Sequence, residues 1–280
     1  MKKLYGLIGC PVSHSMSPEM HNDAFQNHRV KASYHAFHVE THHLEKAVIG
    51  LKALGVAGFN VTIPHKIAVI DYLDKIEPVA AKIGAVNTVV NNNGSLLGYN
   101  TDGLGFVRSL KQLQPTSLHD KKILLIGAGG AARGIYFTLA AEGVKHIDIC
   151  NRTVEKAAFL INDCTYNVVS ESLTLDEAEK QLQQYDIVIN TTSIGMHPNI
   201  DQQPISLKNL KAHTIVSDII YNPLETQWLK QASAKGALTQ NGVGMFIYQG
   251  ALAFEKWTGI FPNIDRMRKI VTKQLGGKIC

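Results

Sequence analysis

A glycine-rich stretch at residues 127–132, GAGGAA, has the spacing of a turn that binds nucleotide phosphates. Gly127 would let the chain turn out of the preceding apolar run, and Gly129 would remove a side chain where a pyrophosphate must touch the backbone. Ala132 would let the following helix pack closely on the strand. The free N–H groups at the start of that helix would face the phosphates. The stretch therefore predicts a dinucleotide site rather than an ordinary strand-to-helix turn.

The residues after the next apolar run indicate which dinucleotide binds. NAD sites usually place Asp or Glu there, to accept hydrogen bonds from the ribose 2′-OH. This chain has Asn151, Arg152 and Thr153, with Lys156 one turn later. A guanidinium, an ammonium and neutral polar groups suit a 2′-phosphate, so the sequence predicts NADP rather than NAD.

An NADP site implies hydride transfer, and a redox step on an alcohol also needs a group that exchanges a proton. The chain lacks a Y-x-x-x-K pair of the short-chain dehydrogenase kind and a Cys/His zinc set. Lys66 and Asp102 are the charged pair that can serve, each expected at the start of a helix that follows a strand. A Lys beside a helix N-terminus is electrostatically unfavourable, which hints at function. An exposed Lys66 and a helix-capping Asp102 are the structural alternatives.

A second polar group precedes the first expected helix. Ser17 and Pro18 predict an N-cap and first helical position. Ser13 and Ser15 lie just before them, where two hydroxyls could hold a carboxylate or could only cap and solvate the loop.

Alternating strand and helix patterns must position these residues. We expect strands at residues 4–9, 34–39, 59–63, 123–126, 146–150, 186–190 and 214–219, with helices between many of them. Pro64 is expected to open a helix that carries Lys66 in its first turn. A hairpin is expected around residues 91–94, and two amphipathic helices after Gly242.

The predicted fold class is α/β with two α/β domains. Residues 1–113 plus 242–280 are expected to form a substrate-binding, catalytic domain with a mainly parallel sheet. Residues 114–241 are expected to form a Rossmann-type NADP-binding domain, and the C-terminal helices to return to the first domain. A length of 280 residues agrees with about two domains at roughly 150 residues each.

Composition excludes several classes of protein. The chain is 45% hydrophobic and 18% charged with a net charge of +5, and no Lys/Arg block suggests nucleic acid. No run approaches the about 18 apolar residues of a membrane helix, and no long apolar h-region follows Lys2 and Lys3, so neither export nor a membrane helix is expected. The four cysteines, including Cys280, form no C-x-x-C pair and are expected to be reduced thiols of a cytoplasmic protein.

The neighbouring His42 and His43 have no acidic or cysteine partner at ligand spacing, so no metal site is expected.

Seven motifs in order resemble the shikimate dehydrogenase family over nearly the whole chain. They are SHSMSPEMHN (13–22), NVTIPHK (60–66), GAVNT (84–88), GYNTDG (98–103), GAGGAAR (127–133), NRT (151–153) and GVGMFIYQGALAFEKWTG (242–259). The resemblance implies reversible NADPH-dependent reduction of 3-dehydroshikimate to shikimate, a step of the chorismate pathway toward aromatic amino acids. It implies a small-molecule substrate. We expect a monomer or homodimer, and the sequence does not distinguish between the two.

The resemblance also implies residue roles. Ser13 and Ser15 would hold the substrate carboxylate, and Lys66 with Asp102 would form the catalytic pair. Other substrate contacts would come from Thr62, Asn87, Asp102, Gln249 and Tyr221. The cofactor would contact Gly127, Ala128, Gly129, Gly130, Ala131, Asn151, Arg152, Thr153, Lys156, Ile219, Gly242 and Met245. Met245 and Gln249 are four apart in a helical pattern and so share one face.

Alternatives remain at this point. A quinate/shikimate dehydrogenase would use a broader range of substrates and NAD, and Glu155 lies near the expected ribose site. A nucleotide-sensing relative without catalysis should have lost Lys66 or Asp102, and both are present. An enzyme like methylene-tetrahydrofolate dehydrogenase has a comparable plan, but the SHSMSP stretch argues against it. Lys156 stands where many family members carry a second Arg, and it meets a phosphate without a bidentate fork.

Overall fold

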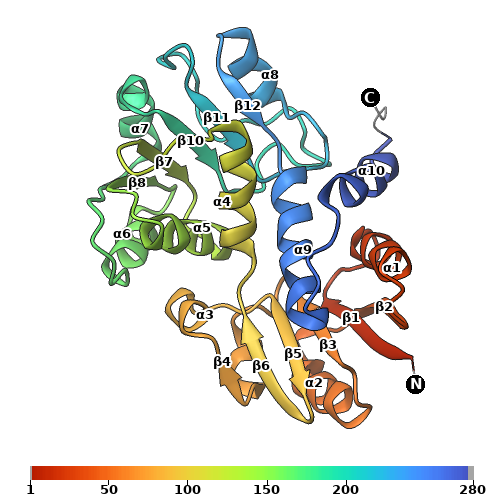
Figure 1. Ribbon diagram of the computed structural model, residues 1–280. Helices are drawn as coiled ribbons and strands as arrows, with labels where there is room; N and C mark the ends of the chain where they lie inside the picture. The colour runs from red at the N-terminus through yellow and green to blue at the C-terminus, as the bar shows by residue number, and fades with distance from the viewer. Residues whose placement is uncertain (1, 277–280) are drawn as a thin grey trace. The chain divides into compact units, whose positions relative to one another are not determined.

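The computed structural model describes residues 2–276, and Cys280 lies outside them. Within that range the chain folds into two compact units, residues 2–105 with 247–276 (unit 1) and Phe106–Phe246 (unit 2). The junctions fall inside helices α4 (Asp102–Leu113) and α9 (Val243–Thr258). The sequence instead predicted junctions at 113/114 and 241/242. Each unit contains a six-stranded sheet with helices around it (Figure 1).

Unit 1 contains a mixed sheet with the strand order β2-β1-β3-β5-β6-β4. Its pairings are parallel for β1–β2, β1–β3 and β4–β6, and antiparallel for β3–β5 and β5–β6. The strands are β1 (Lys3–Gly9), β2 (Ala32–His38), β3 (Gly58–Val61), β4 (Lys75–Ile76), β5 (Thr88–Asn92) and β6 (Ser95–Tyr99). The helices are α1 (Ser17–Asn27), α2 (Leu44–Ala53), α3 (Pro78–Ile83) and α10 (Ile264–Gln274), with short 3-10 helices η1 (Thr41–His43) and η2 (Ala68–Tyr72).

Unit 2 is a parallel sheet in the order β12-β11-β10-β7-β8-β9, the strand order of a Rossmann fold. The strands are β7 (Lys122–Ile126), β8 (His146–Cys150), β9 (Ser172–Leu173), β10 (Ile187–Asn190), β11 (Ile215–Asp218) and β12 (Leu238–Gln240). The helices are α5 (Gly130–Ala141), α6 (Val154–Asn162), α7 (Leu175–Gln181) with the 3-10 turn η3 (Leu182–Gln184), and α8 (Gln227–Ala234). The predicted α/β fold class with a Rossmann-type unit is confirmed.

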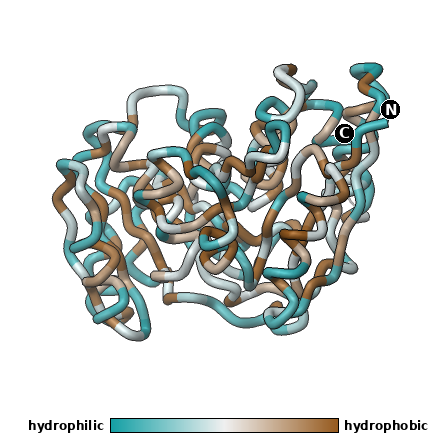
Figure 2. Tube along the Cα trace, turned by 90° about the horizontal axis from the view of Figure 1, so that it is seen from below, coloured by the Kyte–Doolittle hydropathy of each residue, from teal (hydrophilic) through white to brown (hydrophobic). Residues whose placement is uncertain are grey.

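Each sheet has its own hydrophobic core, as the apolar strand sequences require. In unit 1 the core includes Phe59 and Val89, and in unit 2 Leu124 and Trp228, all at most 1% exposed. Hydrophobic stretches (brown) alternate with hydrophilic ones (teal) along the trace in Figure 2. This alternation is what amphipathic helices and strands covering a sheet need.

The C-terminal segment completes unit 1. The Trp257 ring of α9 packs on Tyr5 with centroids 5.0 Å apart, and its indole N–H donates to the Val89 carbonyl over 2.9 Å. Gly58 leaves room for this ring, because a Cβ there would lie 2.4 Å from the indole nitrogen. From α10, Arg266 forms a two-pronged ion pair with Asp23 of α1 at 2.6 and 2.7 Å.

Two local expectations are wrong. The N-cap of α1 is Met16, which makes no side-chain cap, and Ser17 is instead a buried first helical residue. No α-helix begins at Pro64, since residues 63–67 form a turn and the next element is η2. In this turn the His65 N–H donates to the Thr62 carbonyl, three residues earlier, whereas an α-helical hydrogen bond spans four residues. The dipole argument for Lys66 therefore does not apply.

Candidate active site

The two candidate catalytic side chains meet in unit 1. Lys66 Nζ lies 2.7 Å from Asp102 Oδ2, and the side chains are 28% and 12% exposed. Lys66 comes from the turn after β3, and its carbonyl accepts a hydrogen bond from Val86 N–H at 2.8 Å. Asp102 is the first residue of α4. Partial burial of an ammonium–carboxylate pair strengthens their attraction and leaves one side accessible, so the pair can take or return one proton.

Asn87 fixes the other oxygen of the Asp102 carboxylate. Its amide Nδ2 donates to Asp102 Oδ1 at 2.8 Å and to Thr101 Oγ1 at 2.9 Å. Its Oδ1 accepts from the Thr101 backbone N–H at 2.8 Å and from Thr88 Oγ1 at 3.0 Å. Because both donors and the acceptor of this buried amide are used, its orientation and that of Asp102 are determined.

A deeper layer of hydrogen bonds supports Asn87. The Tyr34 hydroxyl of β2 donates to Asn60 Oδ1 at 2.8 Å. Asn60 Nδ2 then donates to the Asn87 carbonyl and to Thr88 Oγ1, each at 3.0 Å. Tyr34 is only 1% exposed, and burial raises the pKa of its phenol well above 10.0. A buried path of hydrogen bonds therefore runs from Tyr34 to Asp102.

Sequence reasoning missed the roles of Tyr34 and Asn60. A signal was present in the strand FNV, because Asn60 stands between the apolar residues Phe59 and Val61 of a fully buried strand. A buried amide needs partners for each polar atom, so such an Asn marks a network.

The other unit 1 candidates lie on neighbouring segments. Ser13 is exposed in the loop that follows β1, and Ser15 Oγ accepts from the Ser17 N–H at 3.3 Å. The Thr62 methyl group lies over Gly9, where an added Cβ would be 2.3 Å away. Gln249 of α9 lies against Gly105, one turn after Asp102, since a Cβ on Gly105 would be 2.6 Å from the Gln249 nitrogen. Direct hydrogen bonds join Lys66, Asn87 and Asp102, and the contacts of the other four with a substrate stay predictions.

In unit 2 the glycine loop has the predicted conformation. Gly127 has φ +107°, and a Cβ there would be 2.7 Å from Thr191 Oγ1, so glycine is required. Gly129 is the N-cap of α5 and supplies no side-chain cap, while nothing lies within 4 Å of the Cβ positions of Gly129 and Gly130. Ala132 is fully buried. The start of α5 thus has small residues with open space around their Cβ positions, and the free N–H groups of a helix N-terminus there would fit a pyrophosphate.

The predicted 2′-phosphate residues follow β8. Asn151 Nδ2 donates to the Thr153 carbonyl at 2.8 Å and closes the turn, and Thr153 is the N-cap of α6. Arg152 and Lys156 are exposed, and neither forms an ion pair within residues 2–276. Both cations are therefore available to an anion.

Residues at the ends of β11 and β12 form a third group in unit 2. Gly242 N–H donates to the Ile220 carbonyl at 2.8 Å, and a Cβ on Gly242 would lie 2.0 Å from the Ile219 oxygen. Met245, half-buried, follows on α9. Tyr221 packs on Phe246 with ring centroids 5.2 Å apart, and burial raises the pKa of its phenol.

Parallel strands of a sheet end at the same edge, so these groups and the glycine loop share the carboxyl edge of the unit 2 sheet. The loop after β7 and Thr191 after β10 meet where the strand order reverses, the place where open α/β sheets bind ligands.

A buried carboxyl that the sequence did not single out lies at the end of β11. Asp218 is 1% exposed and accepts hydrogen bonds from the Ile220 N–H, Asn190 Nδ2 and Thr226 Oγ1 at 3.0, 3.2 and 3.0 Å. Burial raises its pKa to about 6 against the lowering effect of these donors. Its bonds tie β10, β11 and the N-cap of α8 together.

The structure corrects the expectation about possible metal ligands. His42 was expected to lack an acidic partner, but Glu40 Oε2 lies 3.5 Å from His42 Nδ1. Sequence spacing did not predict this contact, because it depends on the turn of the chain between β2 and η1.

Among the described helices, none combines the length and apolar character needed to cross a membrane.

Comparison with known proteins agrees with this arrangement. Three family profiles match, described as the shikimate dehydrogenase substrate binding domain (residues 7–89), shikimate / quinate 5-dehydrogenase (109–221) and the shikimate 5′-dehydrogenase C-terminal domain (242–272). A shikimate dehydrogenase (NADP(+)) from Geobacillus sp. (strain WCH70) is 62% identical over 277 residues, which are 99% of this chain and 100% of that protein.

Solved structures resemble the chain over nearly its full length. Shikimate 5-dehydrogenase from Listeria monocytogenes in complex with shikimate and NAD has a TM-score of 0.90 and 38% identity, covering 96% of each chain. Shikimate 5-dehydrogenase from Thermus thermophilus in complex with NADP(H) and shikimate has a TM-score of 0.88 and 30% identity, covering 97% of this chain and 99% of that one. The chain therefore belongs to the shikimate dehydrogenase family.

Proposed function

We propose that this protein is an NADP-dependent shikimate dehydrogenase, which reversibly reduces 3-dehydroshikimate to shikimate on the way to aromatic amino acids. The observation that carries the proposal is the 2.7 Å Lys66–Asp102 pair, held by the Asn87 amide, whose donors and acceptor are all used. A glycine loop with the form expected for phosphate binding supports it. Full-length relatives named as NADP(+)-dependent shikimate dehydrogenases support it.

The reaction requires a hydride and a proton. Bound NADPH supplies the hydride to the ring ketone carbon. Lys66, as an ammonium, gives its proton to the ketone oxygen as that oxygen becomes a hydroxyl, and takes a proton back in the reverse direction. Asp102 holds the Lys66 ammonium toward the reacting oxygen and stabilises its positive charge. The oxidised ketone and the reduced alcohol thus differ by one hydride and one proton, and the pair handles the proton.

Substrate recognition is assigned to the remaining unit 1 groups. Ser13 and Ser15 would bind the ring carboxylate through their hydroxyls, with Ser15 oriented by the Ser17 N–H. Thr62, Asn87 and Gln249 would bind the ring hydroxyls, and Asp102 would accept a hydrogen bond from one of them. Tyr221 of unit 2 is proposed as a further substrate contact. Hydrogen-bonding sites of this kind reject analogues that lack the matching hydroxyl strongly.

Preference for NADP is assigned to Arg152, with Lys156 as a weaker partner. An Arg fork can bind two phosphate oxygens, whereas an ammonium acts as a point charge. The pyrophosphate would lie on the glycine loop, at residues 127–131, and the nicotinamide by Ile219, Gly242 and Met245.

The setting of the enzyme is part of the proposal. Cys10, Cys150 and Cys164 are free thiols, which suits the reducing cytoplasm. We propose a monomer or homodimer that acts on a small molecule.

A test follows the absorbance of NADPH with shikimate plus NADP, and in parallel with quinate and with NAD. Rapid growth of the signal with shikimate and NADP alone is expected. Comparable rates with quinate or NAD would replace the proposal by a broader quinate/shikimate dehydrogenase; the Listeria relative was solved with shikimate and NAD. Absence of turnover with NADP still bound would refute catalysis and favour a nucleotide sensor.

A further inference from the structure

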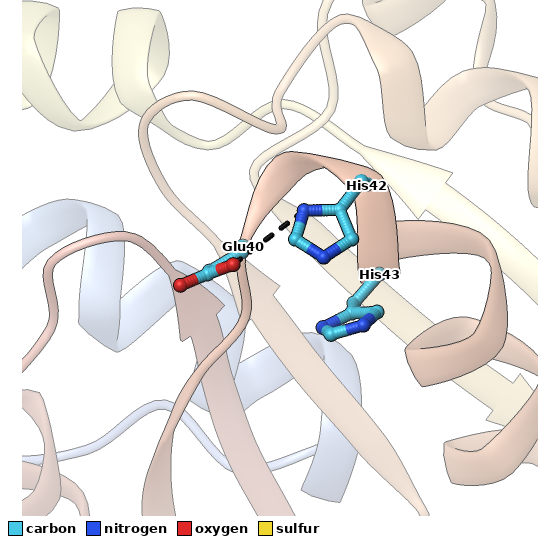
Figure 3. A group of neighbouring side chains, drawn as sticks. All are labelled: Glu40, His42 and His43. Carbon is cyan, nitrogen blue, oxygen red and sulfur yellow. Dashed lines mark ion pairs between the residues drawn. The ribbon is translucent and has the colours of Figure 1, made fainter.

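Three side chains of the kind that can ligate a metal gather just after β2, in unit 1. They are Glu40, His42 and His43, and their candidate ligand atoms all lie within 4.8 Å of one another (Figure 3). Glu40 directly precedes η1, and the two histidines belong to it. Figure 3 shows the Glu40 carboxylate and the His42 ring facing each other, with the His43 ring below.

The local backbone explains the grouping. The His43 N–H donates to the Glu40 carbonyl over 2.9 Å, so the chain makes one tight turn. This turn projects the two imidazoles from one side with ring centroids 3.9 Å apart. The Glu40 and His42 side chains are 57% and 67% exposed, so an ion and its water can reach them.

The spacing matches a first coordination shell. With bonds of about 2.0–2.2 Å in a tetrahedral site, neighbouring ligand atoms lie about 3.3–3.6 Å apart. The 3.5 Å between Glu40 Oε2 and His42 Nδ1 falls in that range. The His43 ligand atom lies within 4.8 Å of the other two, and rotation of this exposed side chain can bring it closer.

The chemistry of the ligands selects the ion. Two imidazoles and one carboxylate suit Zn²⁺, Co²⁺, Ni²⁺ or Cu²⁺, whereas Mg²⁺ and Ca²⁺ prefer oxygen ligands alone. Within residues 2–276 the Glu40 carboxylate has no ion pair besides His42, so it is not committed to another cation.

We propose that Glu40, His42 and His43 form a surface site for one divalent transition-metal ion of the Zn²⁺ class, with water completing the coordination. The site is separate from the proposed dehydrogenase chemistry, because neither the Lys66–Asp102 pair nor the glycine loop contributes a ligand. Its test does not depend on activity.

The experiment titrates the full-length protein, stripped with EDTA, with Co²⁺ and follows the visible absorption of the ion, then displaces it with Zn²⁺. One equivalent should bind with the spectrum of nitrogen and oxygen ligands and without a sulfur-to-cobalt charge-transfer band. Separate His42→Ala, His43→Ala and Glu40→Gln variants should each bind at least about tenfold more weakly, because even outer-shell changes cost that much.

Two matched controls make the result specific. His35→Ala removes an exposed imidazole of β2 that lies outside the cluster, and binding should persist. Cys10→Ser removes a thiol whose Sγ lies 3.4 Å from His38 Nε2, the other nearby soft ligand pair. Unchanged binding in His42→Ala, loss of binding in Cys10→Ser, or no binding to the unaltered protein would each overturn the proposal.

Discussion

The hydrogen bond from Tyr34 to Asn60 offers a test of whether buried groups position the catalytic pair. Tyr34→Phe removes one hydroxyl and leaves the ring in place. The hydroxyl donates to Asn60 Oδ1 at 2.8 Å, and Tyr34 is too buried, at 1% exposure, to touch a substrate. The change therefore acts indirectly, and the bonded route from the hydroxyl to Asp102 runs through Asn60 and Asn87.

The expected loss of stability and turnover follows from the acceptor Asn60 Oδ1, which loses its hydrogen-bond donor. Asn60 Oδ1 would be left without its partner inside the protein, which costs about 1–3 kcal/mol of unfolding free energy. Asn60 still donates to the Asn87 carbonyl, but its amide is less firmly oriented. We expect about 1 kcal/mol of this loss to reach the transition state through Asp102, which lowers kcat about fivefold. KM for shikimate should change much less.

The assay combines urea unfolding with initial rates of NADPH formation. Tyr5→Phe is the matched control, because Tyr5 is equally buried in the same unit and its hydroxyl makes only a long 3.4 Å bond to the Trp257 carbonyl. Tyr5→Phe should leave kcat unchanged and cost less stability. If Tyr34→Phe loses stability while kcat stays equal to that of the control, the network is structural and does not position Asp102.

Three further predictions concern the catalytic pair, the cofactor and pH. Lys66→Ala should lower kcat by about 10²–10⁴-fold with a smaller effect on substrate binding, and an unchanged kcat would refute its role as the proton donor. Arg152→Ala should reduce the NADP-over-NAD ratio of kcat/KM more than Lys156→Ala does; equal effects would contradict the ranking. Burial lowers the pKa of His21 from 6.5 to about 3, so the unfolded chain binds more protons and stability falls as pH drops from about 6.5 toward 3, by up to about 5 kcal/mol. Burial raises the pKa of Asp218 from 3.8 to about 6, so its contribution is present below about pH 4 and is lost, by about 3 kcal/mol, as pH rises through 6. Between about pH 4 and 6 the two effects oppose each other, so in urea unfolding across pH 4–8 the stability of His21→Leu should fall more steeply with rising pH than that of the unaltered protein, and the stability of Asp218→Asn should rise more steeply. Profiles parallel to that of the unaltered protein would contradict both assignments.

Local sequence signals predicted the Rossmann unit well. The apolar run before Gly127 and the glycine at a position with φ +107° are properties of a few adjacent residues. The prediction of a helix at Pro64 was wrong because the outcome depends on a distant segment. The proline is a local signal for a helix start, but the Lys66 carbonyl accepts a hydrogen bond from the Val86 N–H, and the chain makes a turn there.

The candidate site was predictable in part. Residue chemistry and motif resemblance both selected Lys66 and Asp102, but their 2.7 Å separation depends on how β3 and α4 are placed in unit 1. The bond between Tyr34 and Asn60 was hidden because their strands, β2 and β3, are separated by β1 in the sheet. The Glu40–His42 contact was missed because it depends on one tight turn rather than on helical or strand spacing.

The return of residues 247–276 to unit 1 determines the order in which a growing chain can fold. Unit 2 is one continuous segment and is complete once residue 246 has left the ribosome. Unit 1 begins first and must wait for the later helices, because Tyr5 and Val89 lack their partner until Trp257 emerges. All six strands of the first sheet lie within residues 3–99, so a nascent chain carries that sheet without its C-terminal helices through most of translation. A premature stop near residue 246 would release a protein with an intact Rossmann unit and an unfinished substrate unit.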